Sequence, residues 1–389
     1  MKRTIAVITG SRAEYGLLRW LIDAIHSAAD FELQLIVTGM HLSPEFGLTY
    51  REIEKDGYPI AHCVEMLLSS DSSVGVTKSM GLGMIGFADA FALFKPDLVV
   101  VLGDRFEIFA AASAAMVARI PIAHLHGGES TQGAYDEAFR HAITKMSHLH
   151  FVAAEPYRQR VIQLGEDPSH VFTVGGLGLD NIKKLTLLSR EDLAVALNLS
   201  WGAKNLLVTF HPCTLEKNSA EAQIEQLLTA LESLEDTHFI FTMPNADDDN
   251  FIIRQRIEAF VSKHPHAYAY TSLGQLRFLS CLQFVDGMIG NSSSGLIEAP
   301  SFKKGTINIG HRQTGRIKAE SVIDCEPTAQ SILDAVSILY SSAFKNKLDT
   351  IENPYGNGDA SEYIMRVLRR VDFQQLGKKV FYDIPAYEE

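Results

Sequence analysis

Apolar residues occur along the chain in short continuous runs separated by amphipathic stretches. Thr4–Thr9 is almost wholly apolar, and leucines and isoleucines at helical spacing follow over residues 16–28. A short continuous apolar run is typical of a strand buried on both faces, and a period of about 3.6 residues is typical of a helix with one buried face. The opening therefore predicts a strand, a loop over Gly10–Tyr15 and a helix that begins at Gly16.

The same alternation continues to about residue 180. It predicts strands at Leu33–Thr38, Asp97–Leu102, Ile120–His124 and Val171–Val174, and helices at Glu107–Ala118 and Glu137–Met146. The run Asp97–Leu102 is apolar at successive positions, as expected of a central strand in a parallel sheet. Strands that alternate with helices predict a doubly wound parallel sheet.

The alternation pauses over residues 176–190 and then restarts, which predicts a hinge between two domains of the same class. Ser189, with an acidic residue three positions later, resembles the N-terminus of a helix. Strands are then predicted at Leu206–Phe210, Phe239–Met243, Gly287–Ile289 and Thr306–Ile309, and helices at 219–233 and 250–263. The sequence thus predicts an α/β fold of two Rossmann-like doubly wound domains that face a cleft.

The expected domains are residues 1–180 and 181–370, with a C-terminal tail at 371–389. The pattern leaves open whether the last helix, Ala360–Val371, and the tail pack back on the N-terminal domain. A chain of 389 residues with 46% apolar and 21% charged side chains is long enough to form two cores.

Charge and cysteine content exclude several classes of protein. A net charge of −12 argues against nucleic-acid or membrane binding. The apolar runs are too short for a membrane span, and the first one is too short for a signal peptide. The four cysteines are scattered without a CxxC pair, which argues against a zinc ribbon or a disulfide framework. We therefore expect a cytoplasmic protein.

Polar clusters follow several of the predicted strands, and open parallel sheets bind ligands at this edge. The first cluster is Gly10–Gly16. Its glycines, its helix N-terminus and Arg12 can hold a phosphate, although a plain turn with a surface arginine has the same pattern.

The next two clusters carry carboxylates and histidines. Asp104, at the mouth of a buried strand, is suited to proton transfer if it is partly desolvated, or it caps the helix that follows. His124, His126, Glu129 and Asp136 form the other cluster. Because the two histidines share a strand face without a fixed third ligand, acid–base chemistry is favoured over a metal site, and a solvated acidic loop remains the alternative.

The second half of the chain has clusters of the same kind. His211 and Asn245 each lie at or just after the end of a predicted strand. Gly290–Gly295, which contains Ser292 and Ser293 and precedes a predicted helix with Glu298, is a plausible diphosphate cradle. Arg312, after the last strand, can supply charge to the same group. The alternatives are a serine-rich capping loop and an exposed loop cation.

Taken in order, these clusters resemble the UDP-N-acetylglucosamine 2-epimerase family over nearly the whole chain. The landmarks are Gly10–Tyr15, Thr38–Ser43, Gly103–Glu107, His124–Glu129, His211-Pro212, Pro244–Asp247 and Gly290–Ser293. The family has a hydrolysing and a non-hydrolysing branch. Gly-Asp-Arg-Phe-Glu and Gly-Gly-Glu resemble the hydrolysing branch, whereas the non-hydrolysing branch typically has Gly-Asp-Thr and His-x-Glu-Ala-Gly. The resemblance implies a glycosyltransferase-B-like fold, a UDP-sugar substrate, neither cofactor nor metal, and a homodimer or homotetramer.

The resemblance also implies roles for individual residues. Asp104 and Asp136 match proton-transfer carboxylates, and His211 matches a histidine of the cleft. The third proton-transfer residue is left open between His126 and Glu129. The positions around the nucleotide and its phosphates are Arg12, Gly16, Arg105, Asn245, Ser292, Ser293, Glu298 and Arg312.

The implied reaction eliminates UDP through a 2-acetamidoglucal and adds water back with the opposite configuration at C2. It converts UDP-N-acetylglucosamine to UDP and N-acetylmannosamine, a precursor of sialic-type acids. The alternative substrate is UDP-2,4-diacetamido-2,4,6-trideoxyglucose, of the legionaminic acid pathway. A non-hydrolysing epimerase, a retaining glycosyltransferase and a non-catalytic nucleotide-sugar sensor remain as rival functions.

Overall fold

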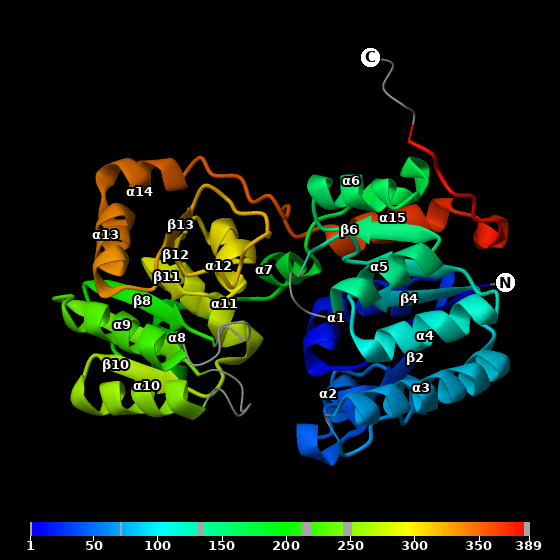
Figure 1. Ribbon diagram of the computed structural model, residues 1–389, viewed down its shortest axis with the longest axis horizontal. Helices are drawn as coiled ribbons and strands as arrows, with labels where there is room; N and C mark the ends of the chain where they lie inside the picture. Colours follow the sequence, from blue (N-terminus) through cyan, green and yellow to red (C-terminus); the bar gives the residue numbers. More distant parts are fainter. Residues whose placement is uncertain (1, 71, 131–135, 212–219, 244–250, 385–389) are drawn as a thin grey trace. The chain divides into compact units, whose positions relative to one another are not determined.

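The computed structural model describes residues 2–70, 72–130, 136–211, 220–243 and 251–384. The chain divides into two compact units (Figure 1). The first unit consists of Met1–Asn181 together with Gly358–Glu389, and the second is Ile182–Asn357.

The described part of the first unit contains one sheet of seven strands in the order β3-β2-β1-β4-β5-β6-β7. The strands are β1 (Arg3–Thr9), β2 (Phe31–Thr38), β3 (Ile60–Val64), β4 (Leu98–Leu102), β5 (Ile122–Leu125), β6 (Leu149–Val152) and β7 (Val171–Thr173). All neighbouring pairs in this sheet are parallel. The direction of winding reverses between β1 and β4, and such a switch point is where doubly wound sheets bind ligands.

Helices cover both faces of this sheet. They are α1 (Arg12–His26), α2 (Tyr50–Lys55), α3 (Ser73–Phe94), α4 (Phe106–Val117), α5 (Asp136–Met146), α6 (Glu155–Gln163) and α15 (Ala360–Arg370). Helix α7 (Asp180–Lys184) begins in the first unit and ends in the second. Along β1, Ile5 and Val7 pack in the core shared with α1 and α15, whereas Ala6 and Ile8 pack in the core shared with α3 and α4. Burial on both faces explains the continuous apolar runs in the sequence.

The second unit repeats this architecture, with six strands in the described residues in the order β10-β9-β8-β11-β12-β13. They are β8 (Lys204–Thr209), β9 (Thr237–Thr242), β10 (Ala267–Tyr270), β11 (Gly287–Gly290), β12 (Gly305–Ile309) and β13 (Val322–Cys325). The helices are α8 (Arg190–Leu197), α9 (Ala220–Glu232), α10 (Phe251–Lys263), α11 (Gly274–Phe284), α12 (Ser294–Ile297), α13 (Ala329–Tyr340) and α14 (Ser342–Leu348). The predicted class, two doubly wound parallel-sheet domains, is confirmed.

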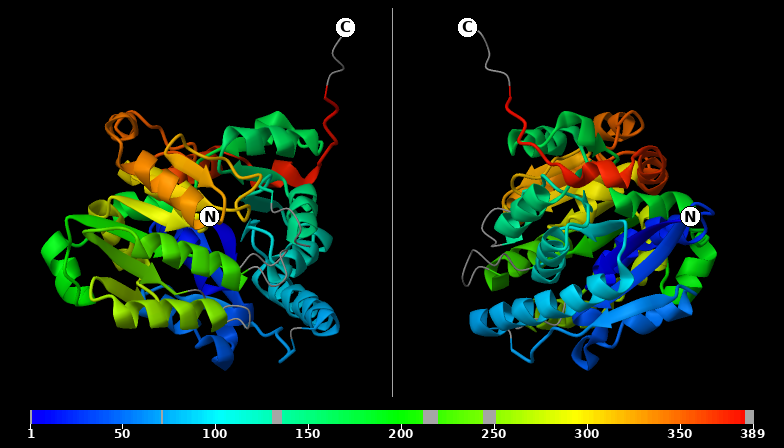
Figure 2. Two further views of the ribbon diagram at one scale, coloured as in Figure 1. Left: turned by 60° about the vertical axis from the view of Figure 1, so that its left-hand side comes forward. Right: turned by 90° about the vertical axis from the view of Figure 1, so that its right-hand side faces the viewer.

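Helix α15 belongs to the first unit although it lies near the end of the sequence (Figure 2). The buried Asp180 carboxylate accepts hydrogen bonds from the Ala360 and Ser361 backbone N–H groups, at 2.9 and 2.8 Å, and so caps the helix. Its apolar face, including Ile364 and Leu368, is part of the core around β1. The structure therefore corrects the predicted boundary after residue 370, because this apolar face needs the first sheet to cover it.

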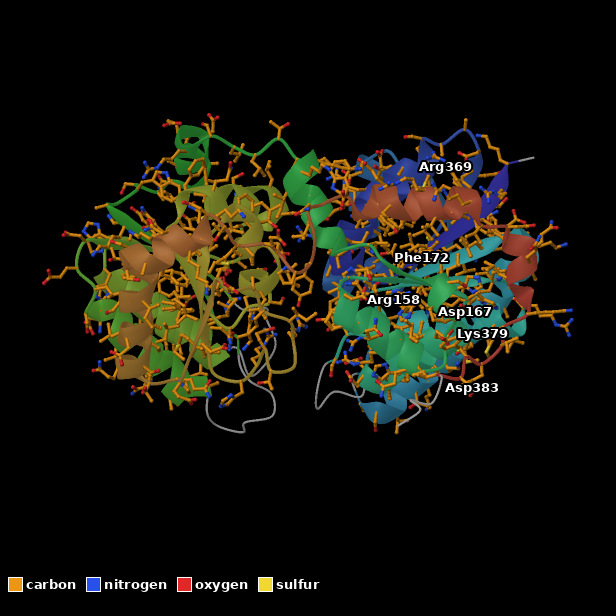
Figure 3. All side chains as sticks on the ribbon, turned by 90° about the horizontal axis from the view of Figure 1, so that it is seen from above. Arg158, Asp167, Phe172, Arg369, Lys379 and Asp383 are labelled. Carbon is orange, nitrogen blue, oxygen red and sulfur yellow. The ribbon has the colours of Figure 1, made fainter. Side chains whose placement is uncertain are left out.

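The tail after α15 is also attached to the first unit. Lys379, labelled in Figure 3, donates hydrogen bonds to the backbone carbonyls of Lys145 and Ser147, each at 2.6 Å, at the end of α5. Its Nζ also lies 2.6 Å from the buried Glu166 carboxylate. Lys379 of the tail thus contacts the helix that carries Asp136.

Candidate functional site

The loop between β1 and α1 is shorter than predicted. Ser11 caps α1, because its Oγ accepts a hydrogen bond from the Glu14 backbone N–H at 3.4 Å, and the helix begins at Arg12. Gly16 consequently lies inside the helix, where its carbonyl accepts a hydrogen bond from Asn181 at 3.4 Å. The Arg12 side chain is 61% exposed, with Nε 3.2 Å from Glu52. The prediction that the helix starts at Gly16 is wrong.

A carboxylate cluster occupies the switch point between β1 and β4. Arg105 donates two hydrogen bonds to the buried Glu107, at 2.8 and 3.2 Å, and its Nε lies 3.8 Å from Glu14. Burial raises the pKa of Glu14 to about 7, although the Gly10 N–H and Arg105 oppose the shift. This carboxyl group can therefore exchange a proton near neutral pH.

Glu14 and Glu107 were not among the predicted site residues. The sequence contains a pattern that could have indicated them, because each of the two glutamates follows an arginine by two residues in the segment after a buried strand. The loops after β1 and β4 lie side by side because these two strands are neighbours in the sheet, and this strand order is known only from the structure.

Asp104 is held by an arginine from the neighbouring helix. Arg140 donates a hydrogen bond to Asp104 Oδ2, and its other terminal nitrogen donates to Glu137 at 3.1 Å and to the Glu129 carbonyl at 3.0 Å. Burial raises the pKa of Asp104; Arg140 opposes the shift, while Asp136 and Glu129 add to it. Arg140 is a site residue to which the sequence assigned no role.

The alternative that Asp104 caps α4 is wrong. The residue in the capping position is Arg105, and its side chain makes no capping hydrogen bond. Asp104 is thus a carboxylate at the end of β4 that contacts another helix.

The two histidines after β4 have different environments. His124 is fully buried, with Nε2 2.8 Å from the Gly103 carbonyl and Nδ1 3.1 Å from Thr144 Oγ1. Burial lowers the pKa of His124 to about 3, so this ring is neutral and ties β5 to its neighbours.

His126 lies beyond the end of β5, with a positive φ of 62°. Its Nδ1 is 2.8 Å from Glu129 Oε1, and its Nε2 accepts a hydrogen bond from the Leu177 backbone N–H at 3.4 Å. This pattern assigns the ring proton to Nδ1. The strand ends before His126, so the predicted shared face with His124 is wrong, and His126 and Glu129 form one hydrogen-bonded pair.

In the second unit, the end of β8 is bound to the loop after β11. The His211 N–H donates to the Asn291 side chain and the Asn291 amide donates to the His211 carbonyl, each at 2.8 Å. Arg312 and Gln313 donate to the Asn291 carbonyl, at 3.1 and 2.7 Å. Burial, assisted by Arg312, lowers the pKa of His211 to about 4, so the ring is neutral at physiological pH.

Gly290 makes this close approach possible. Its φ is 139°, and a Cβ at this position would collide with the Thr209 carbonyl oxygen. A larger residue would therefore move Asn291 away from His211.

The serine loop is followed by a helix that is shorter than predicted. Ser292 Oγ accepts a hydrogen bond from the Ser294 N–H at 3.3 Å, and Ser293 is in the capping position of α12. Glu298 lies just after this helix. Burial raises the pKa of Glu298 to about 7, and its Oε2 is buried with no hydrogen-bond partner among the described residues.

The predicted site residues thus fall into two groups. Asp104, Arg105, His126, Glu129 and Asp136 belong to the first unit, with Arg12 on the same edge of the sheet. The second unit contains His211, Ser292, Ser293, Glu298 and Arg312. Asn245 lies outside the described residues. Within the described ranges, no group of three or more His, Cys, Asp or Glu side chains could hold a metal ion.

The model of one protein family, described as UDP-N-acetylglucosamine 2-epimerase, matches residues 23–369. The chain belongs to this family. The resemblance inferred from the strand-end motifs is confirmed.

Three curated relatives match nearly the whole chain. One from Campylobacter jejuni, "GDP/UDP-N,N'-diacetylbacillosamine 2-epimerase (hydrolyzing)", is 42% identical over 98% of this chain and 100% of its own. The "Polysialic acid biosynthesis protein P7" of Escherichia coli is 39% identical over 98% of both chains. The "UDP-N,N'-diacetylbacillosamine 2-epimerase (hydrolyzing)" of Legionella pneumophila is 37% identical over 95% of this chain and 97% of its own.

Solved structures share the fold at low identity. A putative UDP-N-acetylglucosamine 2-epimerase from Listeria monocytogenes has a TM-score of 0.80 at 19% identity and covers 96% of this chain and 98% of its own. The Neisseria meningitidis UDP-GlcNAc 2-epimerase bound to UDP-GlcNAc has a TM-score of 0.76 at 20% identity, over 95% of this chain and 100% of its own. The predicted glycosyltransferase-B-like fold is confirmed. None of the helices in the described ranges has both the length and the apolar character to cross a membrane.

Proposed function

We propose that this protein is a hydrolysing UDP-sugar 2-epimerase, which cuts the C1–O bond of its substrate and inverts C2. The observation that carries the proposal is the Asp104 carboxyl group, which has a raised pKa, is held by Arg140, and is under the electrostatic influence of Asp136 and Glu129. Carboxyl groups in such different environments can serve as acid and base in one reaction. The names of two close relatives support the hydrolysing branch.

In the reaction we propose, a base of the first unit removes the C2 proton. The electron pair of the C–H bond forms the C1=C2 double bond, while the C1–O bond breaks and its electrons leave with UDP. Water then adds to C1, and a proton returns to C2 on the opposite face. Asp104 and Asp136 are assigned to the two transfers at C2, and the His126–Glu129 pair to the proton of the attacking water.

The second unit is assigned to the nucleotide. Departure of UDP is fast only if its developing charge is neutralised, and Arg312 and the Ser292 and Ser293 hydroxyls of this unit can do this without a metal. Arg12 of the first unit is assigned to the same charge. The buried Oε2 of Glu298 has an unused lone pair, which suits a hydroxyl group of the nucleotide.

For the sugar, we propose the 2,4-diacetamido-2,4,6-trideoxyglucose group in place of N-acetylglucosamine, which the sequence motifs favoured. The relatives that are 42% and 37% identical are named for diacetylbacillosamine, which is this sugar. UDP-N-acetylglucosamine is retained as the second candidate because of the relative named for polysialic acid biosynthesis. We place the reaction in the cytoplasm, in agreement with the unpaired cysteines of the described residues.

Proton NMR with each UDP-sugar in D2O tests this proposal. The expected products are free UDP and the 2-epimerised sugar with deuterium at C2, with the higher kcat/KM for the diacetamido substrate. Retention of the C2 proton would exclude elimination, and a stable UDP-linked epimer would indicate the non-hydrolysing reaction. If the protein bound a UDP-sugar tightly but turned over neither of the two, its function would be that of a nucleotide-sugar sensor.

A further inference from the structure

A buried carboxylate binds the C-terminal tail to the first unit. Glu166, in the segment after α6, is 2% exposed. Its oxygens accept hydrogen bonds from Lys145 and His150, at 2.7 and 2.8 Å, and the Lys379 ammonium lies 2.6 Å away. None of these side chains has a role in the proposed reaction. Because a buried carboxylate that loses a partner is strongly destabilised, this network favours an attached tail over a free one.

Residues 379–382 of the tail make further contacts around this network. The Phe381 ring packs against Gly165, where an added Cβ would collide with it, and its centroid lies 4.7 Å from the Lys145 ammonium. The Tyr382 backbone N–H donates a hydrogen bond to the Gly165 carbonyl at 2.9 Å. Lys379, labelled in Figure 3, is thus one of several residues that attach this segment of the tail.

The tail reaches α5 at the last turn of the helix. Lys379 Nζ donates hydrogen bonds to the carbonyls of Lys145 and Ser147, each at 2.6 Å, and lies 3.4 Å from the Thr144 carbonyl. The last carbonyls of a helix lack partners within the helix and form the negative end of its dipole, so an ammonium group is favoured there. Lys379 therefore caps α5 from a position 234 residues beyond Lys145.

Helix α5 in turn holds Asp104 through two sets of contacts. Arg140, one turn before Thr144, donates a hydrogen bond to the Asp104 carboxylate. Thr144 Oγ1 lies 3.1 Å from His124 Nδ1, and His124 Nε2 donates to the Gly103 carbonyl at 2.8 Å. Gly103 directly precedes Asp104. A displacement of α5 would therefore move both the side chain that binds Asp104 and the backbone that carries it.

We propose that Lys379 is a positioning residue for Asp104, and that residues 379–382 hold α5 where Arg140 reaches this carboxylate. The proposal rests on the proposed function, in which Asp104 transfers a proton at C2. A group that transfers a proton must lie within hydrogen-bonding distance of the reacting atom, and a displacement of about 1 Å can lower the rate about 100-fold. The tail thus acts on the candidate site through α5.

The electrostatics of Asp104 distinguish this role from simple stabilisation of the fold. Burial raises the pKa of Asp104, and the neighbouring Asp136 and Glu129 add to this shift. Arg140 and, more weakly, Arg105 lower the same pKa. If the tail no longer held α5, Arg140 would move away and the pKa of Asp104 would rise further. A contact that only stabilised the fold would leave this pKa unchanged in the folded protein.

Lys379→Met in the full-length protein tests the proposal, because methionine keeps the length of the side chain and removes the ammonium group. Carbon-13 NMR of protein labelled at the aspartate carboxyl carbons follows the titration of Asp104, whose signal is the one missing from Asp104→Asn. We expect a higher pKa of Asp104 in Lys379→Met than in the wild type, and a return towards the wild-type pKa in Lys379→Arg.

Turnover provides the second measurement. With UDP-2,4-diacetamido-2,4,6-trideoxyglucose as substrate, kcat of Lys379→Met should fall by about 10–100-fold. KM should change little, because the residues assigned to the nucleotide in the second unit are untouched. The limb of the pH profile of kcat/KM that belongs to Asp104 should move to higher pH, and Lys379→Arg should restore most of the rate.

Two further variants are the controls, and circular dichroism checks that each protein is folded. Lys378→Met, at an exposed neighbouring position, should match the wild type. Leu368→Ala weakens the core under α15 rather than the contact with α5, and should leave the titration of Asp104 unchanged in the folded protein. An equal pKa of Asp104 in the wild type and Lys379→Met would refute the proposal. A raised pKa in a protein that turned over neither UDP-sugar would support the positioning role and refute the proposed reaction instead.

Discussion

At the scale of single residues, Arg140 connects the acidic groups of the first unit. Its side chain is 7% exposed, and its guanidinium donates to Asp104, to Glu137 and to the Glu129 carbonyl. It thereby orients Asp104 while opposing the rise in the pKa of this carboxyl that burial causes. The same contact thus positions Asp104 and limits the rise in its pKa.

Asp104→Asn keeps the size and the hydrogen-bonding capacity of the side chain but removes the exchangeable proton. Turnover is expected to fall by about 10²–10⁴-fold, with UDP binding nearly unchanged. Arg312→Ala serves as the comparison, since loss of a charge-assisted contact should weaken UDP binding directly. Steady-state kinetics and UDP titration calorimetry measure the two effects. Near-normal turnover of Asp104→Asn would leave Asp104 only a structural partner of Arg140.

The motifs of the candidate site could be recognised in the sequence, whereas the partners of their side chains could not. Asp104, His126 and Glu129 were recognisable because strand-end motifs are local. Arg140, by contrast, contacts Asp104 across 36 positions of sequence, and only the fold brings the two side chains together.

At the scale of elements, the buried strands were predictable and α3 was not. Strands β1 and β4 are covered on both faces, and this produces continuous apolar runs. Helix α3 contains glycines where its backbone packs closely: a Cβ at Gly83 or Gly86 would meet Met66 or Val64 at 2.8 or 2.7 Å. These glycines lower helix propensity, and exposed apolar side chains such as Val74 and Ile85 remove the amphipathic period of the helix.

The tail provides a prediction at this scale. Burial disfavours the charged form of Glu166, but hydrogen bonds from His150, Lys145 and Lys379 lower its pKa to about 2. Lys379→Met should lower the free energy of unfolding by about 1–3 kcal/mol at pH 7, because it removes a donor to a buried carboxylate.

The pH dependence of this effect follows from the direction of the shift. The stabilisation from a depressed carboxyl pKa is fully present above the ordinary value of 4.5 and is lost as the pH falls towards about 2. The difference between wild type and Lys379→Met should therefore narrow over this window in urea unfolding curves. Lys378→Met, at an exposed neighbouring position, is the control. If the difference in unfolding free energy stayed constant down to pH 2, Lys379 would stabilise the protein only through its hydrogen bonds to backbone carbonyls.

At the scale of the whole molecule, the first unit is built from two separate segments of the chain. The α15 side chains Ile364 and Leu368 are fully buried in a core that also contains Leu21 and Ile25 of α1. The hinge predicted over residues 176–190 is therefore only one of two connections, since the chain returns to the first unit at Gly358.

Leu368→Ala should destabilise the first unit by about 2–5 kcal/mol through the cavity it leaves. Hydrogen exchange should accelerate in peptides of β1 and α1 and remain unchanged in β8 and β9. Ile338→Ala, at a position 48% exposed on α13, should change the stability by less than about 0.5 kcal/mol. Equal acceleration in both units would mean that they unfold together.

The discontinuous first unit has a consequence for synthesis on the ribosome. Residues 1–181 emerge well before α15 has been translated, and at typical rates the delay is roughly ten to forty seconds. During this time the apolar side chains of α1 that α15 later covers face water or a chaperone. The second unit, Ile182–Asn357, is continuous and can fold as soon as it leaves the exit tunnel. The half of the protein made first is thus the half completed last.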